Sequence, residues 1–214
     1  MLLCVCLCMT CGRITVAQGE PRLVHVFVAL ADNKYQGIVP VPAALGNGED
    51  AAHNLYWGAA FGVRTFLRHS PEWKELSTAE NPNSYVVERT IFRHSATGTL
   101  LVADAYRGRE IKRAILDFYT SATGRPEEPD NTHAKADKDK LQLPQTVALS
   151  VYVGHDGLMD FSIDNNFAGV SNERREVMIL ACASKAFFAP KLRETGAVPA
   201  LWTTGLMAPE AYTL

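Results

Sequence analysis

Residues 146–157 (TVALSVYVGHDG) and residues 176–182 (EVMILAC) decide the fold class of this chain. Each segment contains a short apolar run, and each ends close to a chemically reactive side chain, His155 in one and Cys182 in the other. An apolar run of this length without polar alternation is typical of a strand that is buried on both faces, as in a parallel sheet. The two segments therefore predict buried strands whose ends carry candidate functional residues.

Strands and helices alternate through the rest of the chain. Apolar and β-branched content predicts further strands at residues 23–30 (LVHVFVAL), 85–93, 98–104 and 197–203. Apolar positions at helical spacing predict helices at residues 51–69, 109–120 and 184–195. Residues 123–140 (TGRPEEPDNTHAKADKDK) lack any apolar periodicity and predict an exposed loop. This order predicts a single α/β domain over residues 18–214, a three-layer sandwich with a largely parallel central sheet.

Composition excludes several classes of protein. The chain has 214 residues, which is enough to bury a substantial core without a disulfide scaffold. Its 21 Lys and Arg against 23 Asp and Glu give a net charge of −2, without the basic excess of a nucleic-acid binder. A hydrophobic content of 47% excludes a mostly disordered chain. No zinc site or cofactor is predicted, because the histidines show no metal-ligand spacing: His53, His69, His94 and His133.

Cysteine usage is uneven along the chain. Four of the five cysteines lie at the N-terminus: Cys4, Cys6, Cys8 and Cys11. They accompany an apolar run, MLLCVCLCMT, that is shorter than the roughly 20 residues of a membrane-spanning helix and has the length of a signal-peptide core. We therefore predict a signal peptide at residues 1–17, a secreted or periplasmic protein, and no membrane span. Acylation of Cys11 as a lipoprotein and a buried strand, VCLCM, are the alternatives. Cleavage after Ala17 would leave one thiol, Cys182, which is either a core hydrophobe or a reactive group.

His155 and Cys182 are the candidate catalytic residues. If their strands are parallel neighbours, both side chains lie at the carboxyl edge of the sheet, where α/β proteins bind ligands. A thiolate beside an imidazole is a nucleophile and base pair, and the imidazole can later protonate a leaving amine. The N–H groups of Gly157 and of Cys182, at the start of a helix, are candidate oxyanion donors. The alternatives are a packing cysteine and an ordinary turn histidine. A hydrolase based on Ser184 is less favoured, because no base is predicted beside it.

Two segments, ALSVYVGHDG (residues 148–157) and VMILACAS (residues 177–184), carry a family resemblance. They resemble the catalytic strands of the clan CD cysteine peptidases, the group of the caspases, legumains, gingipains, clostripains and separases, as a bacterial-type member. The resemblance implies a caspase-like fold, with His155 as general acid and base, Cys182 as nucleophile and Gly157 as oxyanion donor.

The same resemblance bears on the substrate site. It implies that the first strand, which ends at Asp32 and Asn33, lies beside the histidine strand and helps to form the substrate pocket. Arg107, ahead of a predicted helix, is a candidate for binding a substrate carboxylate, or else a surface arginine. The sequence departs from the family at Asp156, which stands between the histidine and the glycine. It also ends after a last strand where a caspase-like sheet normally has another, so a fragment or a minimal version is expected.

The sequence predicts a cysteine peptidase that hydrolyses peptide bonds through a Cys182–His155 dyad. Its expected partner is a peptide or protein substrate, with no cofactor and no nucleic acid. A non-catalytic α/β binding or interaction module is the alternative, and the separation of the two side chains and the exposure of the sulfur distinguish the two. Asp156 and Asp160 flank the histidine; turn capping is the expected role, and orientation of the imidazole is the alternative.

Overall fold

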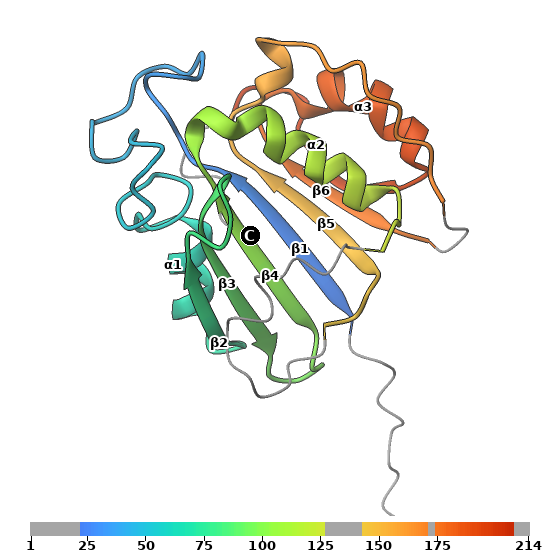
Figure 1. Cartoon of the computed structure of the whole chain (residues 1–214), viewed down its shortest axis with the longest axis horizontal. Helices are drawn as coiled ribbons and strands as arrows, with labels where there is room; N and C mark the ends of the chain where they lie inside the picture. The colour runs from blue at the N-terminus through green and yellow to red at the C-terminus, as the bar shows by residue number, and fades with distance from the viewer. Residues whose placement is uncertain (1–21, 127–142, 171–173, 208–214) are drawn as a thin grey trace, which may run out of the picture.

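A computed structural model describes residues 22–126, 143–170 and 174–207. Within these residues a seven-stranded sheet has the order β2-β3-β4-β1-β5-β6-β7 (Figure 1). The strands are β1 (Leu23–Ala29), β2 (Trp73–Glu80), β3 (Val86–His94), β4 (Leu100–Tyr106), β5 (Val147–Val153), β6 (Glu176–Leu180) and β7 (Val198–Trp202). The helices are α1 (Val63–His69), α2 (Ile111–Ala122) and α3 (Ser184–Thr195), with 3₁₀ turns η1 (Gly108–Glu110) and η2 (Gly157–Met159).

The sheet is mixed but mostly parallel. Strands β4, β1, β5, β6 and β7 run parallel to one another, whereas β3 is antiparallel to both β4 and β2. The predicted α/β class is therefore confirmed, and the β1, β5 and β6 strands lie side by side as expected. Strand β2 was not predicted, because its sequence, WKELSTAE, has no apolar run; it lies at the edge of the sheet and is only partly buried.

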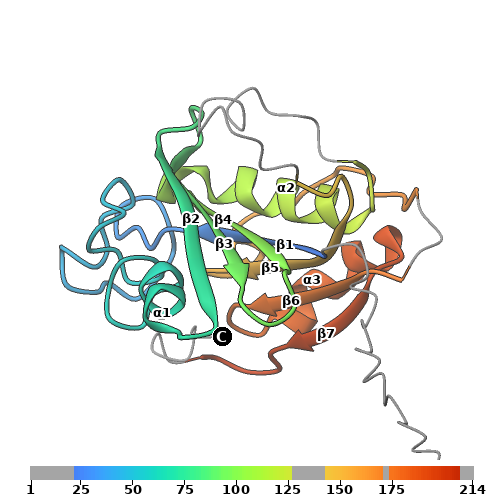
Figure 2. The same cartoon turned by 90° about the horizontal axis from the view of Figure 1, so that it is seen from below.

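Helices cover both faces of the sheet. Successive side chains of a strand point to opposite faces, and on β1 Phe27 enters one core while Val28 enters the other. The first core is closed by α2 and α3 through residues such as Phe118 and Phe188, and the second by α1 through Val63. Figure 2 shows α2 and α1 on opposite sides of the sheet. This arrangement is consistent with the predicted three-layer sandwich.

The helix predicted over residues 51–69 is wrong in its first half. Only α1 is helical there, and residues 51–62 form turns. The Asn54 side chain explains part of this: its amide accepts a hydrogen bond from the N–H of Ala31 (3.0 Å) and donates one to the Ala31 carbonyl (2.9 Å). These bonds tie the turns to the end of β1. A Cβ at Gly58 would lie 2.2 Å from the carbonyl oxygen of Ala52, so the tight turn requires glycine there.

Some predictions concern residues outside those that the structure describes. They are the signal peptide at residues 1–17, its two alternatives (acylation of Cys11 and a buried strand), and most of the loop at residues 123–140. Among the described residues, no helix is long and apolar enough to cross a membrane.

Candidate functional site

His155 and Cys182 follow two strands that are paired in register. Strands β5 and β6 are parallel, and their last pair is Val153 with Leu180. The N–H of Gly154 extends the pairing by donating to the Leu180 carbonyl at 3.2 Å. His155 and Cys182 each stand two residues beyond this pair, at the same edge of strands that lie about 4.8 Å apart. The sequence prediction that both residues lie at the carboxyl edge of adjacent parallel strands is therefore confirmed.

The His155 ring is held by a carboxylate. Its Nε2 lies 2.7 Å from Oδ2 of Asp160, which also accepts a hydrogen bond from the N–H of Gly37 at 3.3 Å. The hydroxyl of Tyr152, a fully buried residue, donates to the His155 carbonyl at 2.8 Å and fixes its backbone. Nδ1 of the ring has no hydrogen-bond partner among the residues described, so it is the nitrogen available for chemistry. Asp160 thus orients the imidazole rather than capping a turn.

Cys182 is half-buried, and its sulfur contacts the chain near its C-terminal end. The N–H of Met207 donates to Sγ at 3.4 Å, and Sγ lies 3.9 Å from the carbonyl oxygen of the same residue. The residue that follows, Ala183, has φ +46° and ψ +29°, a left-handed conformation that is unfavourable for alanine. Backbone strain of this kind is concentrated at functional sites, so the conformation of Ala183 marks the neighbouring Cys182 as a candidate functional residue.

The two predicted oxyanion donors differ in their surroundings. The N–H of Gly157 donates to the carbonyl of His155 at 3.0 Å. A Cβ at Gly157 would lie 2.8 Å from the ring of Phe161, so this glycine is packed inside the turn. The structure therefore does not favour Gly157 as an oxyanion donor. The residue inserted before it, Asp156, explains the change, because Gly157 becomes the first residue of η2. The Cys182 N–H stays a predicted donor.

Asp156 is a buried carboxyl group beside the candidate base. Its Oδ1 accepts a hydrogen bond from the N–H of Leu158 at 3.1 Å and caps η2, so the expected capping role is confirmed for this residue. Its Oδ2 has no hydrogen-bond partner among the described residues. Burial raises the pKa of Asp156 to about 7, and the neighbouring charge of Asp160 contributes to the rise. The group is therefore partly protonated near neutral pH.

This raised pKa predicts that the protein loses stability as the pH rises. Folding favours the uncharged form of Asp156, so its contribution is fully present below about pH 4, the pKa of an unfolded aspartate, and is lost as the pH rises through about 7. Asp156→Asn keeps an acceptor for the Leu158 N–H without the charge. We expect it to raise the free energy of unfolding above neutral pH by a few kcal/mol, up to about 4. Urea denaturation between pH 4 and 8 measures this, with the exposed Asp164→Asn as control. An unchanged pH profile in Asp156→Asn would contradict the assignment.

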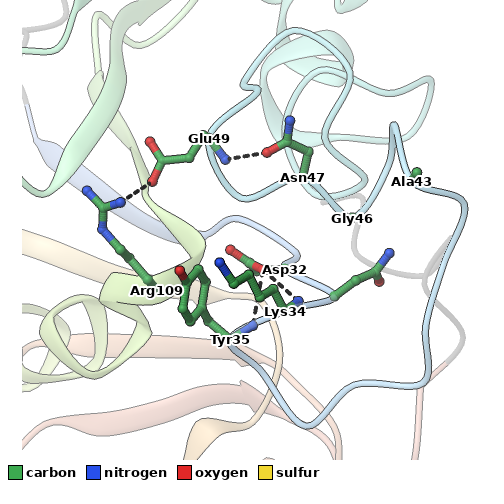
Figure 3. A pocket seen from close by; sticks show the side chains of 9 residues that line it. Asp32, Lys34, Tyr35, Ala43, Gly46, Asn47, Glu49 and Arg109 are labelled. Carbon is green, nitrogen blue, oxygen red and sulfur yellow. Dashed lines mark hydrogen bonds and ion pairs between the residues drawn. The ribbon is translucent and has the colours of Figure 1, made fainter.

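Asp32 and Asn33 lie at the end of β1 and line a pocket of about 440 Å³ (Figure 3). Oδ1 of the buried Asp32 accepts hydrogen bonds from the N–H groups of Lys34 (2.8 Å) and Tyr35 (3.2 Å). The Asn33 side chain bonds both the N–H and the carbonyl of Val41, at 3.0 and 2.8 Å. Both side chains therefore shape the loop that forms the pocket. Because β1 lies between β4 and β5, this pocket opens at the same edge of the sheet as His155.

Arg107 does not line that pocket, and its predicted role in substrate binding is not supported. Its guanidinium pairs with Glu49 and donates to Oδ1 of Asn81 (2.6 Å) and to the carbonyl of Ser84 (3.0 Å), which joins three loops. The arginine in the pocket is Arg109, which pairs with Glu49 at 3.0 Å. Sequence reasoning missed Arg109 because the segment AYRGRE offers two arginines and no sign of which one faces the pocket.

The chain is an α/β protein whose mixed, mostly parallel sheet carries a histidine and a cysteine after adjacent parallel strands. Within the described part of the chain, no three His, Cys, Asp or Glu side chains are grouped as a metal site. No family model, curated protein or solved structure matches the chain.

Proposed function

We propose that this protein is a cysteine peptidase of caspase-like fold, which hydrolyses peptide bonds through Cys182 and His155. The observation that carries the proposal is that His155 and Cys182 each lie two residues beyond the Val153–Leu180 pair, at the same edge of adjacent parallel strands. The proposal is also supported by the position of β1 beside β5, the strand that precedes His155, as the resemblance implies. Because we predict a signal peptide at residues 1–17, we propose that the peptidase acts outside the cytoplasm.

The chemistry assigns one task to each side chain. Nδ1 of His155 accepts the thiol proton, and the Cys182 thiolate attacks the carbonyl carbon of the scissile bond. The resulting imidazolium returns the proton to the leaving amine as the C–N bond breaks, which leaves a thioester. Water, deprotonated by the same imidazole, then hydrolyses the thioester and regenerates the thiol. Asp160, bound to Nε2, would hold the ring in place and stabilise the imidazolium, as an orienting carboxylate does in a catalytic triad.

The pocket beside β1 supports a site for one substrate side chain. It is lined by groups of both charges, among them Asp32, Lys34, Glu49 and Arg109. The loop that forms it is joined to the histidine through the hydrogen bond from Gly37 to Asp160. A peptide bound along this edge of the sheet could therefore place a side chain in the pocket and its carbonyl near Cys182.

Covalent labelling with a peptidyl acyloxymethyl ketone tests the proposal. We expect the reagent to modify Cys182, as shown by mass spectrometry of the intact protein and of its peptides, because the reaction needs an activated thiolate next to a base. Asp160→Asn removes the charge that orients His155 and should slow labelling by about tenfold or more. The matched control is Asp164→Asn, an exposed carboxylate that does not contact the histidine, and it should label at the rate of the unmodified sequence.

The outcome also decides between the two interpretations of the site. Absence of labelling at Cys182 in the folded protein and in its folded variants, or else equal labelling rates in Asp160→Asn and Asp164→Asn, would contradict the peptidase. That result would favour a non-catalytic binding module in which Cys182 is a packing residue.

A further inference from the structure

The chain passes over the start of α3 after it leaves β7. We name residues 203–207 (TTGLM) the C-terminal strap. The strap accepts hydrogen bonds from N–H groups at the start of α3, which have no partner within the helix itself. The N–H of Ala183 donates to the Gly205 carbonyl at 2.8 Å, and that of Lys185 donates to the Thr203 carbonyl at 3.0 Å. The N–H of Ser184 donates to the Thr203 hydroxyl at 3.0 Å. The strap therefore uses the three N–H groups that directly follow the candidate nucleophile.

The far end of the strap lies against the sulfur of Cys182. Both backbone groups of Met207 approach Sγ, its N–H at 3.4 Å and its carbonyl oxygen at 3.9 Å. The Met207 side chain packs against the core on the α1 side of the sheet. A peptide bound for hydrolysis would need the same space, because its backbone must lie next to the thiol.

The two ends of the strap are anchored differently from its middle. Thr203 is fixed: its hydroxyl donates to the carbonyl of Ala181, and its N–H donates to the Ser184 hydroxyl at 2.9 Å. The middle is exposed, since Leu206 is 82% exposed and nothing lies within 4 Å of where a Gly205 Cβ would be. A segment with few buried contacts opens at low free energy. The strap can therefore detach from Cys182 by releasing Met207 while Thr203 stays in place.

We propose that the C-terminal strap is a built-in cover that occupies the peptide-binding position at Cys182 and must be displaced before a substrate binds. This inference rests on the proposed peptidase function. The carbonyl of Gly205 takes the N–H of Ala183 as a substrate carbonyl would, and Met207 lies along the sulfur as a substrate backbone would. Displacement of the strap therefore regulates access to the thiol.

The rate at which iodoacetamide alkylates Cys182 tests the cover independently of peptidase activity. The rate is measured on the full chain at neutral pH by mass spectrometry of the peptide that contains Cys182. Met207→Pro removes the N–H that contacts Sγ, and a chain that ends at Thr204 removes the far end of the strap. We expect both variants to react at least about fivefold faster, because the sulfur becomes more accessible. Gly205→Ala is the matched control, because its carbonyl is retained and its Cβ enters open space; its rate should stay within about twofold.

The results separate this proposal from the one on which it rests. Faster alkylation in the variants, with no labelling by the peptidyl ketone in any of them, would support the cover and overturn the peptidase. Faster alkylation together with a parallel rise in peptide hydrolysis would support both. Unchanged alkylation in folded Met207→Pro, with circular dichroism like that of the unmodified chain, would overturn the cover. If the chain that ends at Thr204 does not fold, the alkylation rate of Met207→Pro alone tests the cover.

Discussion

Cys182→Ala is expected to lower kcat/KM for peptide hydrolysis by about 10³-fold or more, with little change in stability. The substitution removes the proposed nucleophile, on which the acyl intermediate would form. Ser184, the next hydroxyl along the chain, is fully buried and donates to the Ile179 carbonyl at 3.0 Å, so it cannot replace the thiol. Because Cys182 is only half-buried, the loss of its sulfur should cost about 1 kcal/mol or less. Hydrolysis of a fluorogenic peptide library and urea denaturation measure the two effects.

The control for this experiment is the set of cysteines at the other end of the chain. A variant in which Cys4, Cys6, Cys8 and Cys11 are replaced by serine should keep its activity, because the proposed chemistry uses Cys182 alone. Cys182→Ser preserves the shape of the side chain and should be nearly as inactive as the alanine variant, since a hydroxyl is a much weaker nucleophile at neutral pH. Hydrolysis by folded Cys182→Ala at the rate of the unmodified protein would rule out the dyad.

The central strands and their order along the chain could be predicted from sequence because they are largely buried on both faces of the sheet. Strand β6 (Glu176–Leu180) and helix α3 (Ser184–Thr195) have the predicted bounds. A strand covered on both faces carries an uninterrupted apolar run, and the run ends where the chain leaves the core. For the same reason the ends of β5 and β6 could be located, and with them His155 and Cys182. The register between β5 and β6 could not be predicted, because it depends on hydrogen bonds between segments that are distant in the sequence.

The parts that escaped prediction depend on tertiary contacts. Residues 51–62 have a helical apolar pattern, yet the bonds between Asn54 and Ala31 hold them in turns. Arg107 and Arg109 flank Gly108, which packs so closely against Asp32 that a Cβ would lie 2.3 Å from the aspartate Cβ, and such a contact between distant segments cannot be read from the local sequence. The contact of Met207 with Cys182 joins residues on different elements and leaves no local pattern in the sequence.

Asp104→Asn is expected to lower the free energy of unfolding by about 3–5 kcal/mol, because it breaks a buried ion pair from one side. Asp104 lies on β4 and is completely buried. Its carboxylate receives two hydrogen bonds from Arg89 of β3, at 2.5 and 2.7 Å, and lies 3.0 Å from Nε2 of His25 on β1. The substitution removes the negative charge that faces the buried Arg89 guanidinium and the His25 ring. Urea denaturation followed by circular dichroism measures the loss.

The pH dependence of the same pair gives the prediction a second readout. Burial alone would raise the pKa of Asp104, but the charge and hydrogen bonds of Arg89, with those of His25, outweigh it and hold the pKa well below its usual range. A depressed pKa gives a stabilisation that is present above about pH 4, the pKa of an unfolded aspartate, and is lost as the pH falls below it. The unmodified protein should therefore lose stability below about pH 4 more steeply than Asp104→Asn.

A second arginine–carboxylate pair makes it possible to distinguish the effect of burial on stability from the effect of the ion pair itself. Arg68 and Glu75 also form two hydrogen bonds, at 2.5 and 3.0 Å, but their side chains are 38% and 31% exposed. Water screens this pair and solvates whichever partner remains, so Glu75→Gln should change the free energy of unfolding by less than about 1 kcal/mol. If the two variants lose equal stability, the large effect at Asp104 cannot come from an uncompensated buried charge. If Asp104→Asn loses several times more, the burial of the Asp104 site is the cause, because both pairs are bidentate arginine–carboxylate contacts.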